Sequence, residues 1–276
     1  MIEKEKSLEE FLSNLHVEIF SKIPFDFQSV DTHFQPLIDL TIYKIIGYEA
    51  LTRPLFRGKI DDLYKEAIRF DVLSELDLYF RIKALYKAYK EGLDSELLLF
   101  LNVHPKVLSK KHYYQGVTQE FLRLLNFDIK QIVLEISECE QPEDLDLHLK
   151  TIFYYLNQGY QISIDDYGIG SMGYLHLVEI KPSFIKLDQY FVPMGLEDSY
   201  SRSFIEHTSK ICRDLGVRVV AKGVERREEV SLLLSLGINY FQGYYFGKPT
   251  PSLMGGDIYE ERKHKPKYSF QSFAYF

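Results

Sequence analysis

Eight short apolar segments recur along this chain at fairly even spacing, and most of those in its middle and later parts end on a carboxylate, a carboxamide or a lysine. In a barrel of strand and helix units, the carboxyl ends of the strands form one face, where residues distant in sequence become neighbours. The segments therefore predict a barrel whose polar strand ends converge on one site. They are PLIDL (36–40), IIGYEAL (45–51), LLFLNV (98–103), IVLEIS (132–137), QISID (161–165), FIKLD (184–188), VRVVA (217–221) and YFQG (240–243).

Helical periodicity between the strands predicts an α/β fold of the (β/α)8 TIM type. Only the few residues TIYK separate the first two segments, whereas a parallel crossover needs about a dozen or more. The first two strands must therefore be antiparallel, which makes this a modified barrel. Gly216 and Gly237 are expected to end helices. The expected helices cover 7–21, 60–69, 74–91, 116–126, 142–157, 199–214 and 226–236.

The 276 residues, 46% of them apolar, are enough for one large core, and barrels of roughly 250 residues are normal single domains. We expect an N-terminal helical cap over 1–30, the barrel over 31–250, and a tail over 251–276. The tail ends in YSFQSFAYF, and burial of these aromatic residues against the barrel is expected rather than docking of a partner.

Charge and hydropathy exclude several classes. A net charge of −7 argues against a binder of nucleic-acid polymers, which needs a basic stripe. There is no apolar stretch near the ~20 residues that cross a bilayer, so membrane insertion is not expected. The opening MIEKEKSLEE is too charged for a secretory leader, and a cytoplasmic location is expected. Cys139 and Cys212 lack the paired spacing of disulfide frameworks or zinc sites.

Four oxygen donors fall at ends of different strands, namely Glu49, Asn102, Glu135 and Asp165. Each alone is better explained as an exposed strand end, and Asp165 with Asp166 alone could be a turn. Together they indicate an oxygen-only site for Mg²⁺ or Mn²⁺. Carboxylate-bound metal pairs are a standard device for phosphodiester hydrolysis. Lys186 is then a candidate to orient water or neutralise a phosphate oxygen, with a solvated surface lysine as the alternative.

The motifs, taken in order, resemble those of EAL domains, the cyclic di-GMP phosphodiesterase family. The resemblance spans roughly residues 30–250 and is specific as a set, because the three letters EAL alone mean little. The matching segments are Gln35-Pro36, Tyr48-Glu49-Ala50-Leu51-Thr52-Arg53, Asn102-Val103-His104-Pro105, Leu134-Glu135-Ile136-Ser137-Glu138, Asp165-Asp166-Tyr167-Gly168-Ile169-Gly170, Ile185-Lys186-Leu187-Asp188, Gly223-Val224-Glu225 and Gln242-Gly243-Tyr244.

The resemblance implies roles by position. Cyclic di-GMP would be opened to a linear dinucleotide by metal-activated water. The first metal would be held by Glu49, Asn102, Glu135 and Asp165, and the second by Asp166 among others. Lys186 would contact the attacking water, and Glu138 would anchor the loop after Asp166. The nucleotide contacts would be Gln35, Leu51, Arg53, Asp188 and Gln242. A homodimer is also a family expectation.

One departure is decisive. The family places a glutamate before Gly-Val-Glu to serve the second metal, but this chain has Lys222. An ammonium there opposes metal binding and supplies no ligand. Three interpretations remain open: a slow phosphodiesterase in which Glu225 or water substitutes, a cyclic di-GMP receptor in which Lys222 holds a phosphate, and a regulator acting through protein contacts. The retained polar groups favour a cyclic di-GMP site with impaired hydrolysis.

Overall fold

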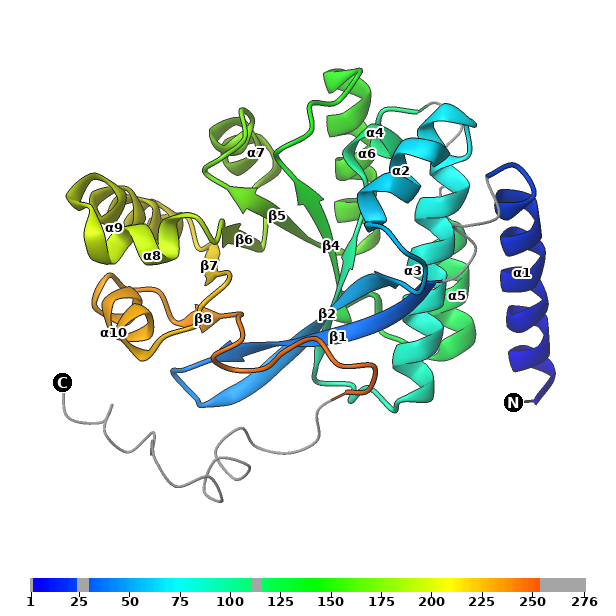
Figure 1. Cartoon of the computed structure of the whole chain (residues 1–276), viewed down its shortest axis with the longest axis horizontal. Coiled ribbons are helices and arrows are strands. Elements are labelled where there is room, and N and C mark those ends of the chain that lie inside the picture. The colour runs from blue at the N-terminus through cyan, green and yellow to red at the C-terminus, as the bar shows by residue number, and fades with distance from the viewer. Residues whose placement is uncertain (1, 24–29, 111–115, 254–276) are drawn as a thin grey trace.

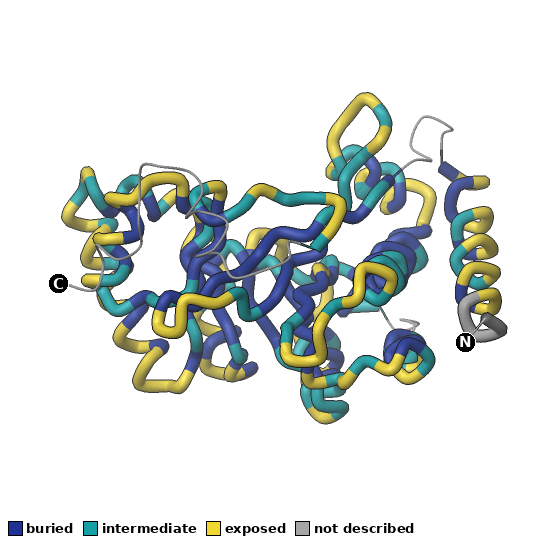
Figure 2. The backbone as a smooth tube through the Cα atoms, turned by 90° about the horizontal axis from the view of Figure 1, so that it is seen from below, coloured by how far each residue is buried: buried dark blue, intermediate teal, exposed yellow. Residues whose placement is uncertain are grey.

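A closed barrel of eight strands, numbered in chain order, forms the centre of the protein (Figure 1). The computed structural model describes residues 2–23, 30–110 and 116–253. The buried stretches of backbone concentrate in the central strands, and the connecting turns are exposed (Figure 2). The strands are β1 (Val30–Asp39), β2 (Lys44–Pro54), β3 (Leu98–Asn102), β4 (Ile132–Ser137), β5 (Gln161–Tyr167), β6 (Phe184–Leu187), β7 (Arg218–Ala221) and β8 (Tyr240–Phe241).

Helices surround the barrel, and all seven predicted helices are present within a few residues of their expected bounds. The short helices α4, α7 and α8 were not predicted, because fewer than about ten residues carry too little periodicity. Gly216 and Gly237 follow α9 and α10 with φ of 73° and 84°, as expected for helix stops. The helices are α1 (Ile2–Phe20), α2 (Ile60–Arg69), α3 (Leu73–Lys90), α4 (Pro105–Leu108), α5 (Val117–Leu125), the 3₁₀ helix η2 (Ile129–Gln131), α6 (Leu145–Gln158), α7 (Gly173–Ile180), α8 (Phe191–Glu197), α9 (Ser199–Asp214) and α10 (Arg227–Ser235).

The first strand runs against its neighbours, as the short connection requires. β1 pairs with β2 in antiparallel register, with Gln35 opposite Glu49, and it also pairs antiparallel with β8. Every other neighbouring pair in the barrel is parallel. The modified TIM-type barrel is therefore confirmed. Its consequence for the site is that Gln35 reaches the barrel mouth from the middle of β1.

Helix α1 lies on the outside of α3 and α5 (Figure 1). The rings of Phe11 on α1 and Phe121 on α5 are 4.8 Å apart between centroids. Leu8, Leu15 and Ile19 are buried on the same face. The helix therefore covers the flank of the helical layer. Most of the predicted C-terminal tail, from residue 254 onward, lies outside the described residues, so its packing stays a prediction.

Successive side chains along a strand point alternately into and out of the barrel. The inward-pointing side chains therefore fill the barrel in layers below the mouth. Phe100, Val133, Phe184 and Val220 form an interior cluster, each two residues before a polar residue at the rim. Phe184 contacts Phe100 at 5.1 Å between ring centroids, and Arg218 lies 3.8 Å from the centroid of Phe184. At the top, Lys186 Nζ is 5.2 Å from the centroid of Phe100. The aromatic layer thus forms the floor of the mouth.

A buried histidine pair joins α6 to α7, the helix that follows the loop after Asp166. The rings of His148 and His176 stack with centroids 5.4 Å apart, and the residues are 0% and 1% exposed. Burial lowers the pKa of each to about 4. Since the unfolded chain takes up protons near pH 6.5 and the folded imidazoles do not, acid favours unfolding below pH 6.5.

We expect the free energy of unfolding to fall by about 2–3 kcal/mol per histidine between pH 6.5 and pH 4. Urea unfolding at several pH values measures it. The His176→Phe variant should lose part of this dependence, while His207→Phe, at an exposed position on α9, should keep all of it. Identical pH profiles in the native protein and His176→Phe would contradict the assignment.

Candidate functional site

The polar residues predicted at the strand ends lie together at the carboxyl end of the barrel. Asn102 and Glu135 are register partners on β3 and β4, and Ser137 pairs with Asp165 on β4 and β5. Glu49, Glu135, Asp165 and Lys186 are each at most 7% exposed. The structure therefore brings the four predicted oxygen donors and Lys186 into one cluster, together with Lys222, which follows β7.

Glu49 accepts hydrogen bonds from three side chains at the barrel mouth. Its Oε1 accepts a hydrogen bond from Asn102 Nδ2 at 3.1 Å. Its Oε2 accepts from Lys186 Nζ at 2.8 Å and from Gln242 Nε2 at 2.7 Å. Burial alone raises the pKa of Glu49, but the charges of Lys186 and Lys222 and these hydrogen bonds bring it to about 2. Glu49 is therefore an anion held by three side chains.

Glu135 is in the opposite electrostatic situation. Its Oε1 forms an ion pair with Lys186 Nζ at 2.5 Å, whereas its buried Oε2 has no hydrogen-bond partner. Burial raises the pKa of Glu135 well above its ordinary value, and the lysine only partly offsets this effect. A buried carboxylate oxygen without a donor is costly. A cation bound beside Glu135 would lower this cost, although Glu135 itself is not among the residues that line the cleft.

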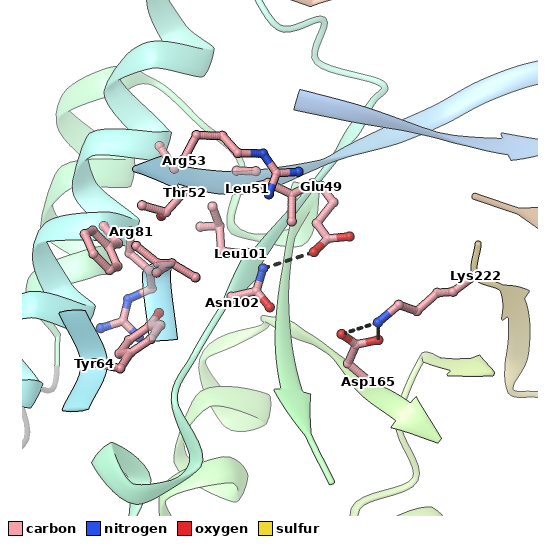
Figure 3. A pocket seen from close by; sticks show the side chains of 14 residues that line it. Glu49, Leu51, Thr52, Arg53, Tyr64, Arg81, Leu101, Asn102, Asp165 and Lys222 are labelled. Atoms are coloured by element: carbon pink, nitrogen blue, oxygen red, sulfur yellow. Dashed lines mark hydrogen bonds and ion pairs between the residues drawn. The ribbon is translucent and has the colours of Figure 1, made fainter. Parts of the chain in front are cut away.

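Lys222 reaches across the mouth to the carboxylates of β5. Its Nζ lies 2.7 and 2.8 Å from the two Asp165 oxygens and 2.8 Å from Asp166 Oδ1. Figure 3 shows the long side chain pointing directly at Asp165. Burial lowers the pKa of Lys222, but Asp165, Glu49 and Asp166 outweigh it and raise the pKa above its ordinary value. The ammonium is thus charged and bound to both aspartates.

The loop after β5 is held by side chains from the end of β4. Asp166 has a φ of 55°, which is unusual for a residue with a Cβ. Its Oδ2 accepts from Ser137 Oγ at 2.6 Å. Glu138 Oε1 accepts from the N–H groups of Gly168 and Gly170 at 2.6 and 3.0 Å. Glu138 therefore contacts the loop after Asp166, and its role as the anchor of this loop stays a prediction. Ser137 was missed, although it points to the same side of β4 as Glu135.

Removing the Glu138 carboxylate should loosen this loop. Hydrogen bonds to a charged acceptor contribute about 1.5–3 kcal/mol each, so in Glu138→Ala the amides of Gly168 and Gly170 should exchange about 10- to 100-fold faster. Hydrogen exchange followed by mass spectrometry measures the change. Glu143→Ala, at an exposed position, serves as control. Unchanged protection in Glu138→Ala would mean that the loop does not depend on this anchor.

A cleft of about 300 Å³ opens beside the cluster. One wall is Glu49 to Arg53 of β2, and Figure 3 shows Arg53 above Leu51 with Tyr64 and Arg81 at the far end. Tyr64 comes from α2 and Arg81 from α3, where Arg81 Nη1 lies 3.1 Å from Asp77 Oδ2. Sequence reasoning missed both residues. Helical positions carry no strand-end signal, so only the packing of α2 and α3 brings them to the cleft.

The remaining residues that were predicted to contact the nucleotide or the metal lie at different places. Gln35 receives a hydrogen bond from Gln242 at 3.4 Å and donates one to Gly247 O, so it lies beside the cluster. Asp188 is buried, and its Oδ1 accepts from the Tyr190 N–H at 2.8 Å, closing a turn after β6. Glu225 is exposed, and its own N–H binds the Glu229 carboxylate at 2.8 Å. Neither Asp188 nor Glu225 is among the residues that line the cleft.

The side chains fit one divalent cation better than two. Glu49, Asn102, Glu135 and Asp165 offer carboxylate and amide oxygens, and Glu135 Oε2 lacks a partner, which suits a hard cation such as Mg²⁺ or Mn²⁺. The second position does not fit, because the Lys222 ammonium lies between Asp165 and Asp166. As these side chains stand, no three His, Cys, Asp or Glu residues in the described part of the chain are grouped to hold a metal ion.

Comparison with known proteins places the whole barrel in one family. A model of the EAL domain matches residues 25–249. The cyclic di-GMP phosphodiesterase PdeL of Escherichia coli is 32% identical over 49% of this chain and 38% of its own length. The chain spans 24% to 57% of the length of the first curated relatives it matches.

Solved structures agree with the family match. A standalone EAL protein from Vibrio cholerae in its c-di-GMP-bound form is 30% identical, with a TM-score of 0.75 over 84% of this chain and 97% of that one. The manganese and cyclic di-GMP complex of Klebsiella pneumoniae BlrP1 is 26% identical, with a TM-score of 0.73 over 83% of this chain and 57% of that one.

Proposed function

Because the chain belongs to the EAL domain family, we propose that it binds cyclic di-GMP at the mouth of its barrel and that two-metal hydrolysis of this ligand is impaired. The observation that carries the proposal is the contact of the Lys222 ammonium with Asp165 and Asp166 at 2.7–2.8 Å. In the family arrangement implied by the motifs, Asp165 binds the first metal ion, and Asp166 faces the second. Here a cation of the chain itself takes that place.

Binding is supported by the residues retained around the cleft. Arg53 supplies a cation for a phosphate, Leu51 an apolar wall, and Gln35 and Gln242 polar groups beside Glu49. Asp188, predicted as a nucleotide contact, belongs to the proposal only through the loop it closes after β6. The V. cholerae relative, similar over most of its length, was solved with c-di-GMP bound. The proposed ligand is this small dinucleotide.

The chain lacks part of the set of metal ligands that two-metal hydrolysis requires. A bound Mg²⁺ or Mn²⁺ at Glu49, Asn102 and Glu135, three of the four donors that the motifs imply, would supply Lewis acidity toward a phosphate or water. Lys186 holds Glu49 and Glu135 in place with its ammonium. Glu225, the candidate substitute for the missing ligand, is exposed and apart from the cleft lining. We therefore assign to the chain weak hydrolysis at most.

A receptor role is the second candidate, and the Lys222 geometry favours it as well. An ammonium bound to both aspartates keeps the mouth assembled without a second metal. A receptor of this kind would act through a regulatory protein partner, and a homodimer is its proposed assembly by analogy with the family. No helix among residues 2–23, 30–110 and 116–253 is both long and apolar enough to cross a membrane.

Binding is tested by calorimetry with cyclic di-GMP in the presence of Mg²⁺ or Ca²⁺. We expect measurable heat and an upward shift of the melting temperature. Arg53→Ala should weaken binding about 10- to 100-fold, because a hydrogen bond to a charged group contributes about 1.5–3 kcal/mol. Arg57→Ala, at an exposed position four residues further, should bind normally. No heat and no thermal shift would favour a regulator that acts through protein contacts alone.

A further inference from the structure

The Lys222 ammonium contacts three carboxylate oxygens of the two aspartates. Its Nζ lies 2.7 and 2.8 Å from the two Asp165 oxygens and 2.8 Å from Asp166 Oδ1. The remaining oxygen of Asp166 accepts from Ser137. A phosphate would therefore have to compete with two carboxylates for this ammonium. Lys222 therefore acts on Asp165 and Asp166 as a fixed counter-ion, and direct capture of the ligand is not its role.

The formal charges of the acidic and basic side chains at the mouth do not balance. If all four acidic side chains are ionised, Glu49, Glu135, Asp165 and Asp166 face the two ammonium groups of Lys186 and Lys222, and two negative charges remain. A phosphodiester anion brought into this field would be repelled. One divalent cation would bring the cluster to neutrality. Glu49 and Asn102, which line the cleft, mark the half of the mouth where this cation would be bound.

We propose that the mouth is a mixed-cation centre, with one exchangeable divalent ion beside Glu49, Asn102 and Glu135 and the Lys222 ammonium as a permanent second cation. The inference rests on the proposed function, because the ligand is its cyclic dinucleotide. Binding then needs one equivalent of divalent ion. The loop beginning at Asp166 stays tethered by Lys222 and Glu138 when that ion is removed.

Counting bound Mn²⁺ tests the proposal without any activity assay. Metal-free protein is titrated with Mn²⁺, and the bound ion is measured by electron paramagnetic resonance. We expect one Mn²⁺ per chain in the native protein and two in Lys222→Glu, where the cation becomes a ligand. Lys210→Glu, with the same charge change at an exposed position on α9, should bind one. Zero or two ions in the native protein, or one in Lys222→Glu, would overturn the proposal.

A second variant covers the case in which Lys222→Glu does not fold. Lys222→Gln removes the fixed charge and adds no anion, so with one Mn²⁺ bound it should bind cyclic di-GMP at least about 10-fold more weakly than the native protein. Equal affinities would overturn the counter-ion role. The proposed binding of cyclic di-GMP and the proposed mixed-cation centre can be refuted independently. Absence of dinucleotide binding with one Mn²⁺ bound refutes the proposed ligand, whereas dinucleotide binding with two Mn²⁺ refutes the mixed centre.

Discussion

Replacing Lys222 with glutamate should raise the rate of Mn²⁺-dependent cyclic di-GMP hydrolysis by about 100-fold or more. Two unit charges ~4 Å apart at an effective dielectric of about 20 interact by about 4 kcal/mol, and a divalent ion roughly doubles this. The substitution turns a repulsion at Asp165 and Asp166 into an attraction and supplies a ligand. Since about 1.4 kcal/mol corresponds to tenfold in rate, even a partial gain is easily measured.

The assay compares initial rates of linear dinucleotide formation in the native protein and three variants. Lys222→Gln removes the cation without supplying a ligand and should gain little. Lys210→Glu repeats the charge change far from the mouth and should gain nothing. Equal and fast rates in the native protein and Lys222→Glu would refute the role given to Lys222. No activity in either would place the defect at a residue other than Lys222.

Substituting Lys186 with methionine should destabilise the fold by about 3–5 kcal/mol. Lys186 is 0% exposed and bridges Glu49 and Glu135, so its loss leaves two buried carboxylates without their shared cation. Methionine keeps most of the side-chain volume over Phe100. Chemical denaturation measures the difference in unfolding free energy.

The matched control is a second substitution in the same background. Glu135→Gln replaces the carboxylate that has the raised pKa with a neutral group of the same shape. Added to Lys186→Met, it should recover a measurable part of the lost stability. A Lys186→Met protein as stable as the native one would show that the carboxylates do not depend on this lysine. Failure of the second substitution to restore stability would argue against Glu135 as the source of the cost.

Much of the site could be predicted from the polar residues at the ends of the apolar strands. The positions of Glu49, Asn102 and Glu135 follow from apolar strands that end on polar residues, because a parallel barrel collects its carboxyl ends on one face. The connection TIYK was too short for a crossover, so antiparallel pairing of β1 with β2 was forced by chain geometry. These inferences needed only local patterns and the dimensions of the backbone.

Other features depended on side chains that meet across different elements. Tyr64 and Arg81 reach the cleft only because α2 and α3 pack beside β2. Glu225 belongs to the same motif as Lys222, yet it is exposed, whereas the Lys222 side chain reaches Asp165 in the mouth. Neither outcome is encoded in spacing, since the direction of a side chain beyond a strand end is decided by its neighbours.

The amino-acid sequence by itself determined that this chain forms a barrel with a polar mouth, and that a lysine stands where the resemblance to EAL domains predicts a glutamate. Only the tertiary structure decided what this cation does. Long-range contacts place the Lys222 ammonium within hydrogen-bond distance of Asp165 and Asp166, more than fifty residues earlier in the chain. The physical reason is that identity and order of charges belong to the sequence, whereas their distances, and hence their energies, arise from folding.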